Sequence, residues 1–149
     1  MRVLAVDPGE KRIGLAISDP LGMLARPLAI LQHKARAVDA QAIAQIAEEN
    51  SCSLIIVGQA LDSEGQIGYR ARKSGRLAEE LGKHTKIKIT LWDESGTTMT
   101  AIQQRIDSGV SKKKRKKALD DLAAAVLLED YLSSETFKML AKEKTDEQK

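Results

Sequence analysis

The first apolar run of the chain ends abruptly at a carboxylate. Residues 3–6 are uninterrupted apolar residues, a pattern typical of a strand that is covered on both faces, and Asp7 follows them directly. Pro8 and Gly9 then mark a turn, and apolar residues alternate from 12 to 18, which predicts a β-hairpin. We therefore expect Asp7 at the end of a central strand, although an aspartate at this point can also simply begin the turn.

Strand and helix patterns follow one another along the rest of the chain. The run at 54–58 is wholly apolar, so we expect a buried strand parallel to the first one, within an α/β fold. Strands are predicted over 28–31, 54–58 and 87–92, and helices over 35–50, 69–82, about 97–108 and 118–133. The apolar face of the helix over 35–50 is expected to consist of Val38, Ala42, Ile43, Ile46 and Ala47.

Length and composition fit a single domain. The chain has 149 residues, 42% hydrophobic and 30% charged, which is enough for one core of ordinary size. We assign residues 1–133 to this domain and 134–149 to a polar tail that is a frayed helix or disordered. No apolar run is long enough to span a bilayer, and no signal peptide precedes the first strand. Cys52, the one cysteine, is expected to pack in the core, and the sequence favours a cytoplasmic protein.

Positive charge is concentrated in one segment. The net charge is only +3, yet six cations stand in succession, and such a block predicts a mobile loop that contacts nucleic acid. A solvated surface run is the alternative. Cations near the predicted turn and in the helix over 69–82 are further candidates. The candidate nucleic-acid-binding residues are Lys11, Arg12, Arg70, Lys73, Lys112, Lys113, Lys114, Arg115, Lys116 and Lys117.

Acidic residues stand where predicted strands end and where the last helix begins. Asp7 ends the first strand, Asp93 and Glu94 end a later strand, and Asp120 and Asp121 open the last helix. The ends of parallel strands meet at one sheet edge, where α/β proteins bind their ligands. Carboxylates gathered there suit Mg²⁺, and two such ions about 4 Å apart could activate water for phosphodiester hydrolysis. Stabilisation of the helix dipole is the alternative role for the last two acids.

Four groups of residues, taken together, resemble a known family. They are residues 7–19, the apolar strand at 55–58, Asp93-Glu94 followed by Thr97-Thr98, and Asp120 preceding Ala123-Ala124-Ala125. In this order and spacing they resemble the YqgF/RuvX family of Holliday-junction-resolvase-like nucleases, often called pre-16S ribosomal RNA nucleases, over about residues 1–132. The resemblance implies a three-layer ribonuclease-H-like fold, with a mixed sheet of about five strands and helices on both faces. It also implies a Mg²⁺-dependent nuclease, with Mn²⁺ as a substitute, that matures the 5′ end of 16S rRNA.

The family's site residues carry over by position. Asp7 matches the acid of the first strand, Glu94 the acid of the Asp-Glu motif, and Asp120 the acid of the final helix. Asp93 is a weaker metal candidate. The chain departs from the family pattern at Gln59-Ala60, where Leu-Pro is usual, and at Ser95-Gly96, where Arg usually follows the acid. These departures leave the acids intact and concern the grip on the substrate.

Other functions fit parts of the same pattern. A Holliday junction resolvase acting on branched DNA would use the same metal chemistry and would need two sites, as in a homodimer. A non-catalytic nucleic-acid-binding module would keep the fold without the chemistry. The turn after Asp7 also resembles the phosphate motif of actin-like ATPases and sugar kinases, but 149 residues leave little room for their second lobe. His33 and His84 show no metal-ligand spacing, and we expect them at the surface.

Overall fold

The computed structural model describes residues 1–60, 68–93 and 112–147 of the chain. Within the last range, residues 112–121 are described as helix without their side chains. The helix expected over about 97–108 lies outside these ranges, as do Glu94 and the Ser95-Gly96 pair.

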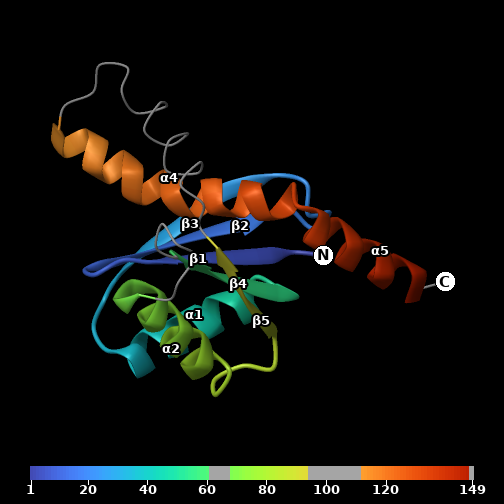
Figure 1. Ribbon diagram of the computed structural model, residues 1–149, viewed down its shortest axis with the longest axis horizontal. Helices are drawn as coiled ribbons and strands as arrows, with labels where there is room; N and C mark the ends of the chain where they lie inside the picture. Colours follow the sequence, from blue (N-terminus) through green and yellow to red (C-terminus); the bar gives the residue numbers. More distant parts are fainter. Residues whose placement is uncertain (61–67, 94–111, 148–149) are drawn as a thin grey trace.

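A five-stranded mixed sheet forms the centre of the molecule (Figure 1). Its order is β3-β2-β1-β4-β5, in which β1 pairs antiparallel with β2 and parallel with β4. The β2–β3 pair is antiparallel and the β4–β5 pair is parallel. The strands are β1 (Val3–Pro8), β2 (Arg12–Ser18), β3 (Ala25–Gln32), β4 (Leu54–Gln59) and β5 (Lys88–Asp93). The predicted hairpin and the predicted parallel strand are both confirmed.

Helices cover both faces of this sheet. Helices α1 (Arg36–Glu49) and α2 (Tyr69–Leu81) lie on one face, and α4 (Lys112–Leu132) crosses the other (Figure 1). Helix α5 (Glu135–Glu147) follows α4. The expected three-layer α/β architecture is therefore confirmed. None of the helices in the described ranges is long and apolar enough to cross a membrane.

Successive side chains of β1 enter two different cores. Leu4 and Val6 pack toward α1 and α2, whereas Val3 and Ala5 pack toward α4. All four are fully buried, which explains why the first apolar run shows no alternation. The residues of β4 divide in the same way between the two cores. Cys52 lies in the core on the α1 and α2 side, as predicted, and burial raises the pKa of its thiol.

The buried face of α1 differs from the predicted one. Ile43 and Ala47 are fully buried as expected, but Val38 is 49% exposed and Asp39 is only 4% exposed. Periodicity alone misses this arrangement because it takes no account of the polar groups in the connection from β3, which Asp39 binds.

Helix α4 starts earlier than predicted. It begins at Lys112, so the basic block from Lys112 to Lys117 is helical, and the prediction of a mobile loop there is wrong. Lys and Arg have good intrinsic helix propensity, which opposes the mutual repulsion of their charges. Because of this earlier start, Asp120 no longer stands in the first turn, which contains no acid. The helix dipole acts mainly within that turn, so the dipole explanation for Asp120 is lost.

The C-terminal segment is helical. Of the two alternatives expected there, a frayed helix and a disordered tail, the structure has a helix, α5, and its Phe137 is only 5% exposed. The Phe137 ring lies 5.4 Å from that of Tyr131 on α4, centroid to centroid. Tyr131 in turn meets Trp92 of β5 edge-on at 4.9 Å. This aromatic cluster attaches α5 to the core, which a polar composition does not reveal.

Candidate active site at the carboxyl end of the central strand

Asp7 lies near the end of β1, at the edge where the parallel strands β1, β4 and β5 finish. Side chains alternate along a strand, so Asp7 belongs to the same face as Val3 and Ala5, the face that α4 covers. The pairing partner of Asp7 on β2 is Gly14. On the other side, β1 and β4 pair through Val6 and Val57, and one residue further Gly58 stands next to Asp7.

Glycine therefore flanks the Asp7 carboxylate on both neighbouring strands. Neither Gly14 nor Gly58 has a side chain beyond a hydrogen atom. Glycine inside a strand often marks a place where a ligand or another backbone approaches closely. Carboxylate oxygen is also the ligand that hard divalent cations prefer. The local donor chemistry fits a hydrated Mg²⁺ ion.

Asp93 does not share a face with Asp7. On β5, Ile89 packs into the core on the α1 and α2 side, while Trp92 packs into the core under α4. The same alternation puts Asp93 on the side of Ile89, opposite to Asp7. The structure thus separates the weaker metal candidate from the first-strand acid.

Trp92 connects the end of β5 to the helix that covers the Asp7 face. Its indole Nε1 donates a hydrogen bond to Asp130 Oδ2 on α4 at 3.0 Å, in addition to the ring contact with Tyr131. These contacts hold β5 and α4 together immediately before the position of Glu94 in the sequence.

The other two predicted ligands lie outside the described side chains. Glu94 lies outside the described residues, and the Asp120 side chain belongs to the part of α4 described only as helix. Within the part of the chain that the structure describes, no three His, Cys, Asp or Glu residues are grouped closely enough to hold a metal ion.

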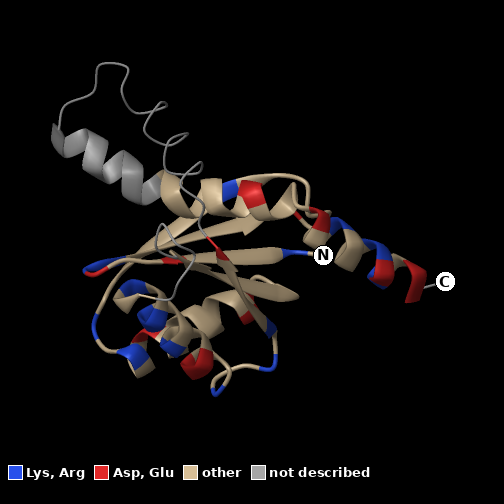
Figure 2. Cartoon of the chain, in the orientation of Figure 1, with Lys and Arg blue, Asp and Glu red and all other residues tan. Residues whose placement is uncertain are grey.

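A basic cleft of about 460 Å³ opens beside the end of β1. Its walls are the turn between β1 and β2 and the first turns of α2. Four predicted nucleic-acid-binding residues meet there, together with the acid Glu10, the aromatic Tyr69 and Ser74. The four cations are Lys11, Arg12, Arg70 and Lys73. Figure 2 shows Lys and Arg gathered at this end of the molecule, around the β1–β2 turn and the beginnings of α1 and α2.

The turn that presents two of these cations needs a glycine. Gly9 donates its backbone N–H to the Arg12 carbonyl at 2.9 Å, which closes the turn. A Cβ atom at position 9 would lie 2.5 Å from that same oxygen, far inside van der Waals contact. The geometry that displays Lys11 and Arg12 is therefore tied to Gly9.

Gln59, one of the departures from the family pattern, supports the opposite wall of the cleft. Its side-chain Nε2 donates a hydrogen bond to the Ala71 carbonyl at 3.0 Å. Ala71 is fully buried in the first turn of α2. The contact joins the end of β4 to the helix that carries Arg70 and Lys73.

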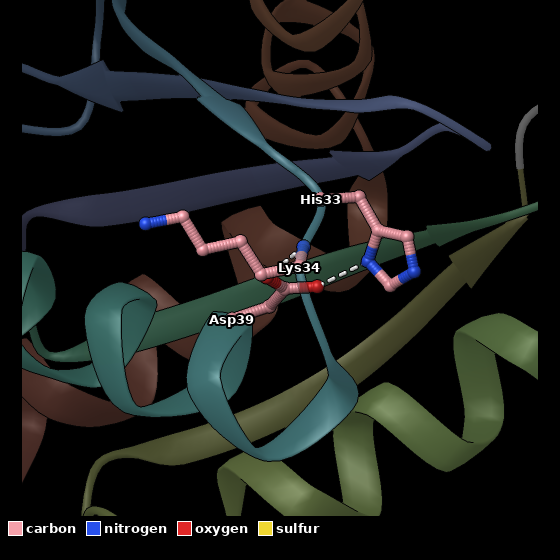
Figure 3. A network of polar contacts seen from close by, with 3 residues as sticks. All are labelled: His33, Lys34 and Asp39. Atoms are coloured by element: carbon pink, nitrogen blue, oxygen red, sulfur yellow. Dashed lines mark hydrogen bonds and ion pairs between the residues drawn. The ribbon is translucent and has the colours of Figure 1, made fainter.

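A buried carboxylate beside this region was not predicted. His33 Nδ1 lies 2.5 Å from Asp39 Oδ2, and the Lys34 backbone N–H donates to Asp39 Oδ1 at 3.1 Å (Figure 3). An ionised carboxylate can only accept hydrogen bonds, so the imidazole donates here. The His33 backbone N–H donates to the Lys11 carbonyl at 2.9 Å, which brings this pair close to the cleft. His33 itself is 39% exposed, in line with the expected surface position.

The fold just described is the ribonuclease-H-like fold of the resolvases. The Holliday junction resolvase of fowlpox virus matches with a TM-score of 0.51 and 16% identity, over 89% of this chain and 98% of that one. The RuvC of T. thermophilus bound to a Holliday junction gives 0.50 at 15% identity, over 85% and 91%. The Mn-soaked terminase nuclease domain of human cytomegalovirus also gives 0.50, at 11% identity, over 93% and 84%.

Within this fold class the chain belongs to the RuvX family. The family model described as "RuvX: Holliday junction resolvase" matches residues 1–134, which confirms the resemblance expected from the motifs. A relative from Desulforamulus reducens is 37% identical over 134 residues, 90% of this chain and 98% of its own length. One from Clostridium acetobutylicum is 34% identical over 134 residues, 90% of this chain and 99% of its own length. Both relatives carry the name "Putative pre-16S rRNA nuclease".

Proposed function

We propose that this protein is a Mg²⁺-dependent endonuclease that cleaves phosphodiester bonds of structured nucleic acid. The observation that carries the proposal is the placement of Asp7. It ends the central strand between two glycine positions, and the next residue, Pro8, lines a cleft with four cations. Membership of the RuvX family supports the same reaction class.

Each group of residues has a separate role in this proposal. Asp7, Glu94 and Asp120 hold the metal, and bound Mg²⁺ would supply activated water and stabilise the leaving oxygen of the phosphodiester. Asp120 is included because it lies four residues before Ala124 and seven residues before Leu127 on α4. Both of these residues pack against the Asp7 face of the sheet. The cations of the cleft bind the phosphates on either side of the scissile one, and thereby orient the strand without taking part in the chemistry.

Precursor 16S rRNA is the proposed substrate, and cleavage would mature its 5′ end. The names of the two bacterial relatives support this choice. The second candidate is a branched DNA junction, which the description of the family model favours. The cytoplasmic location predicted from the sequence belongs to the same proposal.

The first test compares Asp7→Asn with Asp93→Asn in a cleavage assay with Mg²⁺. Asp7→Asn removes a metal-binding charge but keeps the shape of the side chain, so we expect the rate to fall at least about a hundredfold. Asp93→Asn is a matched control at the same sheet edge but on the opposite face, and it should keep most of the activity. Thermal unfolding of both variants shows whether the fold is intact. Cleavage by folded Asp7→Asn at the wild-type rate would refute the proposed site.

The substrates separate the two candidate functions. A transcript that spans the 5′ leader of 16S rRNA and a four-way DNA junction are offered at equal concentration. The rRNA proposal predicts a defined cut in the transcript by the wild type that Asp7→Asn does not make. Symmetric cleavage of the junction alone, by a protein that is dimeric in solution, would favour the resolvase.

A further inference from the structure

Tyr69 is separated from all the other aromatic side chains of the protein. The chain has one Trp, two Tyr and one Phe. Trp92, Tyr131 and Phe137 form the cluster that joins β5, α4 and α5 in the core. Tyr69 instead opens α2, is 62% exposed, and lines the basic cleft. Burial in the core therefore does not account for this ring.

The wall that carries Tyr69 is firmly attached to the sheet. Ala71 and Ser74, in the first turns of α2, are 0% and 5% exposed. The Gln59 amide holds the Ala71 carbonyl, as described above. The Tyr69 ring consequently projects from a fixed helix end, which lowers the entropy lost when a ligand packs against it.

Positive charge surrounds the ring. Lys73 Nζ lies 5.3 Å from the centroid of the Tyr69 ring, a cation–π distance. Arg70 is the next residue on α2, and Lys11 and Arg12 stand on the facing turn. An aromatic face next to several phosphate-binding cations is the combination that proteins use to hold single-stranded nucleic acid. The cleft volume of about 460 Å³ also falls within the range of small-ligand sites and can admit one nucleotide.

We propose that Tyr69 stacks on one unpaired base, while Lys11, Arg12 and Arg70 bind the phosphates that flank it. The cleft then selects nucleic acid with an unpaired nucleotide close to the scissile phosphate, because a base inside a regular duplex cannot reach the ring. This inference rests on the proposed nuclease function and specifies the substrate that its site accepts. Pro8, the residue after Asp7, lines the cleft, so the base would enter at the carboxyl end of β1.

A purely structural role for Tyr69 makes different predictions. Tyr69 and Lys73 are four residues apart on one helix, and such pairs stabilise isolated helices slightly. In that case removal of the ring would lower the melting temperature by a small amount and leave nucleic-acid binding unchanged.

The test measures binding by fluorescence anisotropy in EDTA, so that hydrolysis plays no part. The probes are a single-stranded RNA oligonucleotide and a blunt RNA duplex of the same sequence. We expect Tyr69→Ala to weaken single-strand binding by about 5- to 150-fold, the range that corresponds to one stacked base. Tyr69→Phe keeps the ring and should bind within about twofold of the wild type, because stacking needs no hydroxyl group. Duplex binding should change little in either variant.

Three further variants make the result specific to stacking. Tyr69→Leu keeps an apolar side chain without a ring, and should bind as weakly as Tyr69→Ala. Met139→Ala removes a side chain that is 63% exposed on α5, away from the cleft lining, and should bind like the wild type. Arg70→Gln should weaken both probes and reduce the slope of log affinity against log salt by about 0.7 for the single strand.

Wild-type affinity of Tyr69→Ala for the single strand would overturn the stacking proposal, and so would wild-type affinity of Tyr69→Leu. Neither result would touch the nuclease proposal, since Asp7→Asn tests that in a separate cleavage assay. Conversely, Tyr69→Ala could lose single-strand binding while the wild-type protein cleaves no nucleic acid. That result would support base stacking in the cleft and refute the nuclease proposal.

Discussion

At the scale of single residues, Asp39 shows how one buried carboxylate organises the entry into α1. The N-cap residue of α1 is Ala35, which offers no side-chain oxygen to the first turn. Asp39 instead reaches back and accepts hydrogen bonds from the His33 ring and the Lys34 backbone. The connection from β3 to α1 is thereby fixed beside Lys11, on the rim of the basic cleft.

Replacement of Asp39 by Asn should destabilise the protein. The single oxygen of an amide can accept only one of these two hydrogen bonds, and the amide NH₂ group would face the other donor. We therefore expect the free energy of unfolding to fall by about 1–3 kcal/mol. Urea unfolding measures this loss, with the exposed α5 residue Glu143→Gln as the control. An Asp39→Asn protein as stable as the wild type would mean that the contacts with His33 and Lys34 contribute nothing.

Asp19 is a second carboxylate that accepts backbone hydrogen bonds, in the turn between β2 and β3. The Leu24 and Met23 backbone N–H groups donate to it at 3.0 and 2.6 Å, and they lower the pKa of the Asp19 carboxyl group.

The sequence contains no signal for the Asp39 contacts, because their partners lie five and six residues away and follow neither helical nor strand spacing.

At the scale of elements, the basic start of α4 is where sequence reasoning and structure differ most. Charge repulsion predicted a loop from Lys112 to Lys117, but the helix continues through all six residues. A helix advances by about 1.5 Å per residue, so the backbone of this block is shorter than that of an extended loop of the same length. We still propose that this block contacts a phosphate backbone, as part of a helix rather than a loop.

Neutralising three of these cations should weaken nucleic-acid binding by an electrostatic mechanism. If Lys113, Lys114 and Lys116 all contact phosphates, their replacement by Gln should reduce the slope of log affinity against log salt by roughly two to three. Turnover at saturating substrate should survive, since the cations hold the strand and take no part in hydrolysis. Titrations at several salt concentrations measure the slope. An unchanged slope would return the block to a solvated surface and leave phosphate binding to the cleft.

The strands were easier to predict than the ends of the helices. Residues 3–6 and 54–57 are buried on both faces of the sheet, so their unbroken apolar composition directly predicts central parallel strands. Helix α5 is attached instead by tertiary contacts, Phe137 against Tyr131 with Leu140 and Ala141 packed against the same core, which no local pattern contains. Elements were thus predicted definitely where burial acts along the whole element, and left open between helix and disorder where distant contacts decide.

At the scale of the whole molecule, the candidate site is an edge of the sheet with different chemistry on its two faces. Asp7 belongs to the face under α4, whereas the basic cleft opens between the β1–β2 turn and α2. A nucleic-acid strand that contacts both Asp7 and the basic cleft must cross the carboxyl end of β1. The sequence predicted the acid and the cations as separate sets, but only the fold shows that both lie at the carboxyl end of β1. The packing of Ile89 and Trp92 on opposite faces places Asp93 on the other face, which spacing alone could not reveal.

The most direct test of the account is the location of bound Mn²⁺ in crystals of the full chain. The proposal predicts an anomalous scattering peak bonded to the Asp7 carboxylate, with Glu94 and Asp120 as further ligands, and no peak there in crystals of Asp7→Asn. Mn²⁺ bound at Asp93 without Asp7, or absent from this edge in a protein that still cleaves nucleic acid, would contradict the account.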